Sequence, residues 1–323
     1  MKSSPPDTTV QLPGPAGGAE RVLKRLEWTV IRRLDGLLQG DYRTLMRGTG
    51  MDLADLREYQ HHDDVRHIDW NVTARQQLPH VRVFTEDREM AAWFLLDLSP
   101  SVDFGSGEHK KREVSAGFVA VLARLLTRHG NRVGAMLYGA GVDTVLPARS
   151  GRLHVLRLLH LMQHRAAAQE AGRVTHLHEL LQSAANTVKR RSTLFVVSDF
   201  ISAPGWERPL GLLAQRHEVV AVRLLDPLEL ELPDLGLIPI RDAETGEQLM
   251  VDTSDAGFRK RFARIAAQRE AELRQSLVQA GVDTLELSTD DDLANAIVRF
   301  AEMRKRRSRL SGGSLPSHLR AAA

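Results

Sequence analysis

Between residues 91 and 304, short apolar runs alternate with longer segments in which apolar residues recur every three or four positions. The short runs are typical of buried strands, and the longer periodic segments are typical of amphipathic helices. The predicted strands are Ala91–Asp97, Arg132–Tyr138, Thr193–Ser198, Glu218–Leu224 and Val282–Leu287. The predicted helices are Lys110–His129, Leu153–Gln163, Leu177–Lys189, Pro204–Arg216, Phe258–Gly281 and Asp291–Arg304. This alternation predicts an α/β fold, with a mostly parallel, Rossmann-like sheet and helices on both of its faces.

Smaller features complete the prediction for this region. A short strand at Val142–Leu146 is expected to form a hairpin with the strand before it. A second hairpin is expected where Leu237–Ile240 and Gln248–Asp252 flank a turn at residues 242–246. Thr289 or Asp290 is expected to cap the last helix.

The rest of the chain has a different composition. Residues 1–18 are rich in proline, glycine, serine and threonine and predict a flexible arm. Residues 19–90 form an N-terminal extension, with an apolar helical stripe up to residue 40 and little regular structure expected over 41–80. A strand is expected at His80–Thr85. Residues 91–304 form the α/β domain, and residues 305–323 form a basic, flexible tail.

Charge and composition narrow the class of protein. The net charge is +3, but six basic residues follow the last acidic residue, Glu302, so the body of the chain is net negative and nucleic acid is not an expected partner. The chain contains no cysteine, which fits a reducing compartment and excludes a thiol nucleophile. No secretory signal or membrane-spanning run is visible, so we expect a soluble, cytoplasmic protein.

A group of oxygen-bearing side chains follows two of the predicted strands. Asp97, Ser99 and Ser101 occupy alternate positions where one buried strand ends, and Asp199 follows the end of another. Thr175 lies in a loop just before a predicted helix. Because ligands of parallel sheets bind at the carboxyl ends of the strands, these oxygens are expected to converge there. Oxygen-only ligands favour Mg²⁺ or Mn²⁺, although the serines and Asp97 could instead simply cap turns.

These five residues resemble the metal-ion-dependent adhesion site of von Willebrand factor A domains. In that site an Asp-x-Ser-x-Ser motif is joined by a distant threonine and a distant aspartate, here Asp97, Ser99, Ser101, Thr175 and Asp199. The resemblance implies that hydroxyls contact the metal directly and that carboxylates often act through water. It also implies that an acidic residue of a partner protein fills the open coordination position.

An upstream signature resembles domain-of-unknown-function family fifty-eight, whose members place it before a von Willebrand A-like domain. The matching residues are Leu56–Tyr59, Asp63–Trp70 and Thr73–Arg75. The chain departs from the family pattern at His61-His62, where a Pro-Gly pair is usual, and at Val102, where methionine is common. The resemblance implies association with MoxR-type AAA+ ATPases in the maturation or remodelling of other proteins. Arg66, Asp69, Trp70 and Arg75 are interpreted as a buried polar cluster joining the extension to the sheet, with a functional surface role as the alternative.

The sequence therefore predicts a metal-dependent protein-interaction module, an adaptor to a MoxR-type AAA+ ATPase or to another protein that offers an acidic residue. No residue is assigned a catalytic role. The alternative is a Mg²⁺-dependent phosphoester hydrolase that uses Asp97 and Asp199, but a haloacid-dehalogenase phosphatase needs a second aspartate where Ser99 stands. A second alternative is a nucleic-acid-associated factor that uses the basic tail.

Overall fold

A central six-stranded sheet organises the molecule, for which a computed structural model describes residues 16–26, 30–31, 34, 52–61, 63–85, 91–165, 174–241 and 247–311. The strand order is β10-β7-β6-β3-β4-β5. Its strands are β3 (Ala92–Asp97), β4 (Val133–Tyr138), β5 (Val142–Arg149), β6 (Thr193–Ser198), β7 (Glu218–Leu225) and β10 (Asp283–Ser288). All neighbours pair in parallel except the edge strand β5, which forms the predicted hairpin with β4.

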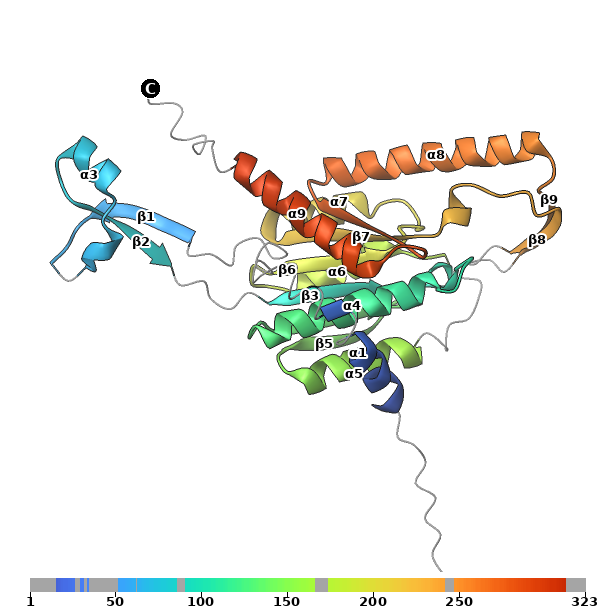
Figure 1. Cartoon of the computed structure of the whole chain (residues 1–323), viewed down its shortest axis with the longest axis horizontal. Coiled ribbons are helices and arrows are strands. Elements are labelled where there is room, and N and C mark those ends of the chain that lie inside the picture. Colours follow the sequence, from blue (N-terminus) through green and yellow to red (C-terminus); the bar gives the residue numbers. More distant parts are fainter. Residues whose placement is uncertain are drawn as a thin grey trace, which may run out of the picture.

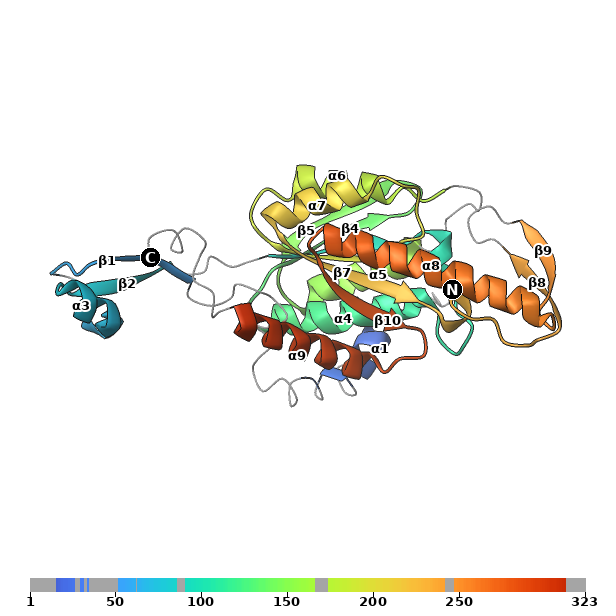
Figure 2. The same ribbon diagram turned by 90° about the horizontal axis from the view of Figure 1, so that it is seen from above.

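Helices cover both faces of this sheet, as Figures 1 and 2 show. On one face lie α1 (Ala16–Leu26), α4 (Lys111–Arg128), α5 (Arg152–Arg165) and α9 (Leu293–Ser311). On the other lie α6 (Leu177–Thr187), α7 (Glu207–Arg216) and α8 (Ala256–Gln279). The predicted fold class, α/β with a mostly parallel sheet between two helical layers, is confirmed.

The central strand β3 supplies both layers of the core. Its six residues are all buried, and alternate side chains point to opposite faces of the sheet. Phe94 belongs to the cluster under α4, where its ring stacks on Phe195 with centroids 5.3 Å apart. Trp93 belongs to the opposite cluster, under α6 and α7. Burial on both faces explains why the strand reads as a continuous apolar run rather than an alternating one.

The segment from 41 to 80, for which little regular structure was predicted, forms a small lobe where the structure describes it. Strand β1 (Asp52–Glu58) pairs antiparallel with β2 (His80–Thr85). Between them lie a 3₁₀ turn, η3 (Val65–His67), and α3 (Trp70–Gln76). Figures 1 and 2 show this lobe set to one side of the main body. The prediction failed because β1 and α3 are short and rich in polar residues, so neither shows a clear hydrophobic period.

The interpretation of the family signature as a buried cluster is wrong. Of its four residues only Asp69 is buried, and its side chain caps α3 by accepting hydrogen bonds from the amides of Asn71 and Val72. Trp70 is 70% exposed, and Arg66 and Arg75 are also exposed. The sequence identified these residues, but it did not indicate that the lobe projects from the sheet. Because the lobe projects, their side chains are not buried against the core of the main body.

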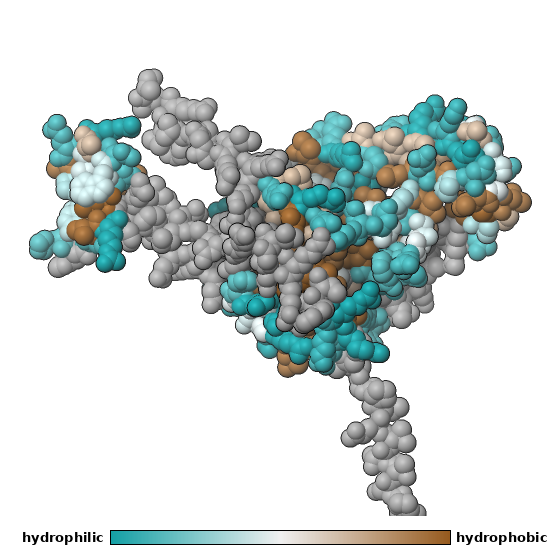
Figure 3. Space-filling view, viewed as in Figure 1, coloured by the Kyte–Doolittle hydropathy of each residue, from teal (hydrophilic) through white to brown (hydrophobic). Residues whose placement is uncertain are grey.

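Two further elements lie at the far end of the sheet from this lobe. The predicted hairpin is present as β8 (Leu237–Arg241) and β9 (Gln248–Asp252), and its turn, 242–246, lies outside the described residues. Figure 3 shows apolar surface gathered at this end. Leu237, Leu249 and Met250 contribute to it with exposed side chains. Figure 2 shows the hairpin and the lobe projecting in opposite directions from the sheet.

The C-terminal helix differs from its prediction at both ends. Asp292, rather than Thr289 or Asp290, accepts hydrogen bonds from the amides of Ala294 and Asn295 and so caps α9. The helix continues to Ser311, into the segment predicted as a flexible tail. Arg304 is buried in ion pairs with Glu218 and Asp283. Within the residues that the structure describes, no helix is both long and apolar enough to cross a membrane.

Candidate metal centre

The structure brings four of the five predicted ligand residues to the carboxyl ends of two adjacent strands, and a loop beside them supplies the fifth. Asp97 ends β3, and Asp199 directly follows β6. Ser99 and Ser101 begin the loop after β3, and Thr175 lies two residues before α6. All five residues are buried, with side chains at most a few per cent exposed.

Asp97 is held in place by short polar contacts. One of its oxygens accepts a hydrogen bond of 2.9 Å from the amide of Ser99, and the other accepts one of 2.6 Å from the hydroxyl of Ser198. Burial, helped by the nearby negative charge of Asp199, raises the pKa of Asp97 to about 6, although the hydrogen bonds from Ser198 and Ser99 oppose the shift. A positive charge beside this carboxylate would favour its ionised form.

The two motif serines place their hydroxyls side by side. Ser99 Oγ and Ser101 Oγ are 3.1 Å apart at the start of a 3₁₀ turn, η4 (Pro100–Asp103). Pro100 suits the first position of that turn because it has no amide hydrogen to leave unpaired. The backbone therefore presents two neutral oxygen donors next to the end of the strand.

The loop that carries Thr175 is anchored by two hydroxyl groups. The amide of His176 donates to the Tyr138 hydroxyl at the end of β4, over 2.9 Å. Ser202 accepts from the amide of Leu177 and donates to the carbonyl of Thr175. Thr175 is thus fixed from the neighbouring strand and from the β6–α7 loop.

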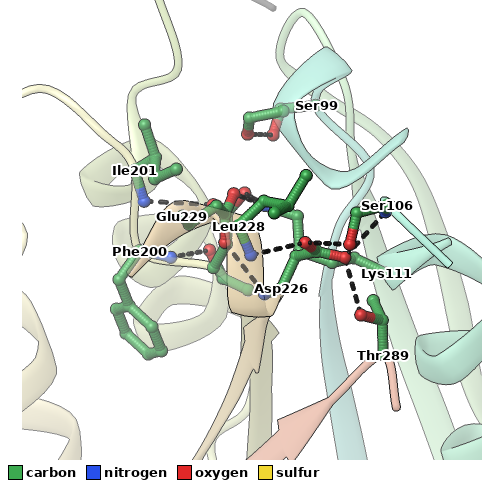
Figure 4. Close-up of polar contacts among 12 residues, drawn as sticks. Ser99, Ser106, Lys111, Phe200, Ile201, Asp226, Leu228, Glu229 and Thr289 are labelled. Atoms are coloured by element: carbon green, nitrogen blue, oxygen red, sulfur yellow. Dashed lines mark hydrogen bonds and ion pairs between the residues drawn. The ribbon is translucent and has the colours of Figure 1, made fainter. Parts of the chain in front are cut away.

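Asp199 sits in a sharply bent segment. The next residue, Phe200, has a φ of +59°, which is uncommon for a residue other than glycine. Its amide donates to Ser198 Oγ over 2.9 Å, and its ring packs on Trp206 with centroids 5.2 Å apart (Figure 4 shows the hydrogen bond). This bend allows Asp199 Oδ1 to accept from the amide of Ile201 at 3.0 Å. Strained backbone of this kind persists where surrounding packing fixes it, often at functional sites.

A buried lysine beside Asp199 was not predicted from the sequence. Lys111, at the start of α4, has a side chain with no exposed surface. Its Nζ lies 2.8 Å from Asp199 Oδ2 and 2.6 Å from Oε1 of Glu229 (Figure 4). Burial alone would lower the pKa of Lys111, but the charges of Asp199 and Glu229 overcome this and raise it. Burial also raises the pKa of Glu229, and Lys111 opposes that shift.

A further buried aspartate, Asp226, was also not predicted from the sequence, and it joins the loops around the centre. Asp226 follows β7 and accepts from both the amide and the hydroxyl of Ser106, from Thr289 Oγ1 and from the amide of Leu228 (Figure 4). It forms a reciprocal capping box with Glu229 around η5 (Pro227–Glu229). Burial would raise the pKa of Asp226, but the hydrogen bonds from Ser106, Thr289 and Leu228 together lower it. The strand ends of β7 and β10 are thereby tied to the loop after β3.

The donor set fits a small, hard cation. It consists of two carboxylates and three hydroxyls, with no sulfur and no imidazole, and such oxygen donors suit Mg²⁺ and Mn²⁺. Within the described part of the chain, no group of three or more His, Asp or Glu residues is placed to hold a metal ion. A cation at this centre would therefore take several of its ligands from neutral hydroxyls.

Comparison with known proteins now gives the family. The profile described as "Protein of unknown function DUF58" matches residues 55–272, which include the upstream signature and the candidate centre. The chain belongs to this family. The resemblance inferred from the signature between Leu56 and Arg75 is therefore confirmed.

Similar proteins have been found in mycobacteria and among solved structures. The uncharacterised protein Rv1480 of Mycobacterium tuberculosis is 39% identical over 296 residues, which cover 92% of this chain and 91% of that protein. BatB from Bacteroides thetaiotaomicron aligns over 67% of this chain and 99% of its own, with 13% identity and a TM-score of 0.44. The SpRpn10 VWA domain aligns over 65% of this chain and 94% of its own, with 12% identity and a TM-score of 0.38. Neither structure is similar enough to bring a functional conclusion to this chain.

Proposed function

We propose that this chain is a protein-interaction module that recognises an acidic residue of its partner through a Mg²⁺ or Mn²⁺ ion at the candidate centre. Asp97, Ser99, Ser101, Thr175 and Asp199 would hold the ion. The observation that supports this most strongly is the pair of hydroxyls, Ser99 and Ser101, 3.1 Å apart beside two buried strand-end carboxylates.

The charge balance of the centre favours an incoming carboxylate. Only Asp97 and Asp199 contribute negative charge among the five residues, and Lys111 Nζ already neutralises part of Asp199. A divalent ion bound there would have only two anionic ligands, one of them shared with Lys111, so its open coordination position would still attract a glutamate or aspartate from outside. We further propose that the partner is a MoxR-type AAA+ ATPase, that the pair acts in protein maturation or remodelling, and that it works in the cytoplasm.

The alternative, a phosphoester hydrolase, has no observation in its favour. Both oxygens of Asp97 are engaged, one by the Ser99 amide and the other by Ser198 Oγ, which leaves this carboxylate poorly placed to attack a phosphorus atom. Ser99 stands where a phosphatase of the haloacid-dehalogenase type needs an acid. We therefore propose that the module has no catalytic activity of its own.

Metal binding is the first test of this function. Titration calorimetry with Mn²⁺ and Mg²⁺ should show one site on the full chain and no binding to Asp97→Ala, because that variant loses half of the carboxylate charge. Ser254→Ala, a substitution of an exposed serine outside the centre, should bind as the wild type does. Equal metal binding by wild type and Asp97→Ala would show that the candidate centre does not hold the ion.

Partner capture is the second test. The double substitution Ser99→Ala/Ser101→Ala removes both members of a hydrogen-bonded pair at once, so we expect the fold to lose no more than about 1–2 kcal/mol. A pull-down of the MoxR-type ATPase should nevertheless fail with this variant, and it should fail with the wild type in EDTA. If the ATPase is captured equally well in EDTA, and the isolated chain hydrolyses a phosphoester in a metal-dependent way, the hydrolase is favoured instead.

A further inference from the structure

Lys111 has an arrangement that the proposed function does not explain. It is the first residue of α4, its side chain has no exposed surface, and its ammonium group bridges Asp199 Oδ2 and Glu229 Oε1. Asp199 is one of the proposed metal ligands, so an internal cation and a divalent ion would share one carboxylate. Figure 4 shows Lys111 and Glu229 among the polar contacts below Ser99.

A purely structural explanation accounts poorly for this choice of residue. Burying a lysine is costly unless its charge is matched, and an apolar residue of similar size often stabilises a protein as well or better. The neighbouring Lys110 avoids most of this desolvation cost, because its side chain is half exposed and its Nζ lies 3.4 Å from Asp103 Oδ1. The buried position of Lys111 makes sense if its charge acts on something inside the centre.

The charges around Asp199 are closely balanced. Lys111 contributes one positive charge and Glu229 one negative charge, and both groups lie on the same side of Asp199. The amide of Ile201 takes the remaining oxygen, Oδ1, at 3.0 Å. Since both oxygens of Asp199 already accept hydrogen bonds, this carboxylate offers a cation less free charge than an isolated aspartate would.

We propose that Lys111 is a positioning residue that holds Asp199 in place and opposes the divalent ion, with Glu229 offsetting part of its charge. This inference rests on the proposed metal centre and deepens it. Repulsion between the ammonium group and a bound cation keeps the metal affinity of the isolated chain low. A partner carboxylate then adds the missing negative charge, so the ion and the partner bind together more tightly than either binds alone.

The test is a set of four variants whose Mn²⁺ affinities should fall in a fixed order. Lys111→Met keeps the length of the side chain but removes its charge, and we expect it to bind Mn²⁺ at least about ten-fold more tightly than wild type. Glu229→Gln leaves Lys111 unopposed, so it should bind more weakly than wild type. The double variant Lys111→Met/Glu229→Gln should lie between Lys111→Met and wild type, because Lys111 contacts Asp199 directly and Glu229 acts through it. Lys110→Met, the exposed neighbour, should stay within about two-fold, because water screens its charge.

Mn²⁺ affinity would be measured by electron paramagnetic resonance and calorimetry, and thermal unfolding would be followed in EDTA and in Mn²⁺. Lys111→Met should lose stability in EDTA, where the buried Asp199 and the partly buried Glu229 lack their shared ammonium group, and should regain more on adding Mn²⁺ than wild type does. The double variant removes one charge of each sign and keeps the comparison available if the single variant does not fold.

The possible results separate this inference from the proposed function. Tight binding by both Lys111 variants, with weaker binding by wild type, supports the inference even if the affinity of wild type is very low. Equal affinities for wild type and the double variant would overturn it and leave the metal centre standing. Absence of Mn²⁺ binding from wild type, Lys111→Met and the double variant alike would overturn both.

Discussion

Two buried aspartates near the centre show how local hydrogen bonding decides the state of a carboxyl group. Asp97 is the last residue of β3, Asp226 directly follows β7, and both are fully buried. The pKa of Asp97 is raised to about 6 by burial and by the charge of Asp199. The pKa of Asp226 is lowered, because Ser106, Thr289 and Leu228 all donate to it and outweigh its burial. Asp97, whose ionised form is disfavoured, is the proposed metal ligand. Asp226, whose ionised form is stabilised by hydrogen bonds, holds the surrounding loops together.

The raised pKa of Asp97 predicts a pH dependence of stability. A carboxyl group whose pKa is higher in the folded state than its ordinary 3.8 binds protons more tightly when folded, so it stabilises the fold as the pH falls. Between about pH 6 and pH 4 the metal-free wild type should therefore gain stability relative to Asp97→Asn, by on the order of 2–3 kcal/mol in full. Urea unfolding in EDTA at pH 7, 6 and 5 measures this difference.

The comparison with Asp97→Asn separates Asp97 from the other groups that titrate over the same range. His154 and His217 have pKa values lowered by burial, and both are present in the two proteins, so their contribution cancels. A stability difference between wild type and Asp97→Asn that does not change from pH 7 to pH 5 would show that the pKa of Asp97 is not raised.

At the residue scale the sequence indicated the proposed ligands but not their neighbours. Asp97, Ser99 and Ser101 were found because they form one short motif after a recognisable strand. Lys111 and Glu229 are separated by 118 positions and meet only through the fold, so no local pattern pairs them. The rule that drew attention to strand ends would also have pointed to Asp226 after β7 and Thr289 after β10, had it been applied to every strand.

At the scale of elements, Asp226 connects three strand ends around the centre. It belongs to the end of β7, while Ser106 lies in the loop that follows the Asp-x-Ser-x-Ser motif and Thr289 follows β10. The capping box with Glu229 extends this connection to Lys111. The geometry of the motif loop therefore depends on a contact 120 residues away in the sequence.

Removal of the Asp226 side chain should weaken both stability and metal binding. Asp226→Ala leaves the buried hydroxyl of Thr289 and the two donors of Ser106 without their acceptor, which should lower the free energy of unfolding by about 3 kcal/mol. The loop after β3 should loosen, and Mn²⁺ affinity should fall as a result. Thr289→Ala removes one donor only and should cost about 1 kcal/mol. Urea unfolding and Mn²⁺ titration of both variants test this, and wild-type stability for Asp226→Ala would show that these bonds contribute little.

The pairing of β3 with β4 makes a different demand on the sequence. Gly134 lies opposite Trp93 in the register, and a β-carbon at position 134 would come within 2.7 Å of the indole ring. Gly134→Ala should therefore destabilise the protein by about 2 kcal/mol, because the ring is packed and cannot easily move. Gly141→Ala, where a β-carbon would meet nothing within 4 Å, is the matched control. Similar thermal unfolding of the two variants would contradict the close contact.

Elements of the main body were predicted well, as was β2 of the lobe, but β1, η3 and α3 were not, for a physical reason. Strands such as β3 and β6 are buried on both faces, and their continuous apolar runs are visible in the sequence. Strand β1 has the sequence DLADLRE, in which four charged residues outnumber three apolar ones. A two-stranded ribbon of this kind is stabilised by its single neighbour and by local caps such as Asp69, which leave little periodic signal.

At the scale of the whole molecule, the candidate centre and the signature lobe lie at opposite ends of the sheet. The centre is at the carboxyl ends of β3 and β6, whereas the lobe precedes the amino end of β3 along the chain (Figures 1 and 2). A partner that touches the exposed Trp70 therefore contacts a different surface from one that binds at Asp97 and Ser99. The signature and the metal motif are thus two separate features of this family member.

The C-terminal helix shows where the folded body ends. Phe300 and Ala301 are buried in the core beside α4, and Arg304 closes this contact through buried ion pairs with Glu218 and Asp283. The next seven residues continue α9 to Ser311, and they include Lys305, Arg306 and Arg307. Residues 312–323 lie outside the described part of the chain.

This arrangement predicts a sharp boundary for truncation. A chain that ends at Ser311 should match the full-length protein, because residues 312–323 are mainly glycine, serine, alanine and leucine without an apolar stripe. A chain that ends at Arg304 should lose no more than about 1 kcal/mol, since it gives up only the last helical turns. Arg304→Ala in the full-length chain should lose about 3 kcal/mol, because it removes a buried guanidinium that pairs with the partly buried carboxylates of Glu218 and Asp283. Thermal and urea unfolding of the three proteins should therefore rank the single substitution as more damaging than the loss of nineteen residues, and the reverse order would show that the basic segment itself packs on the body.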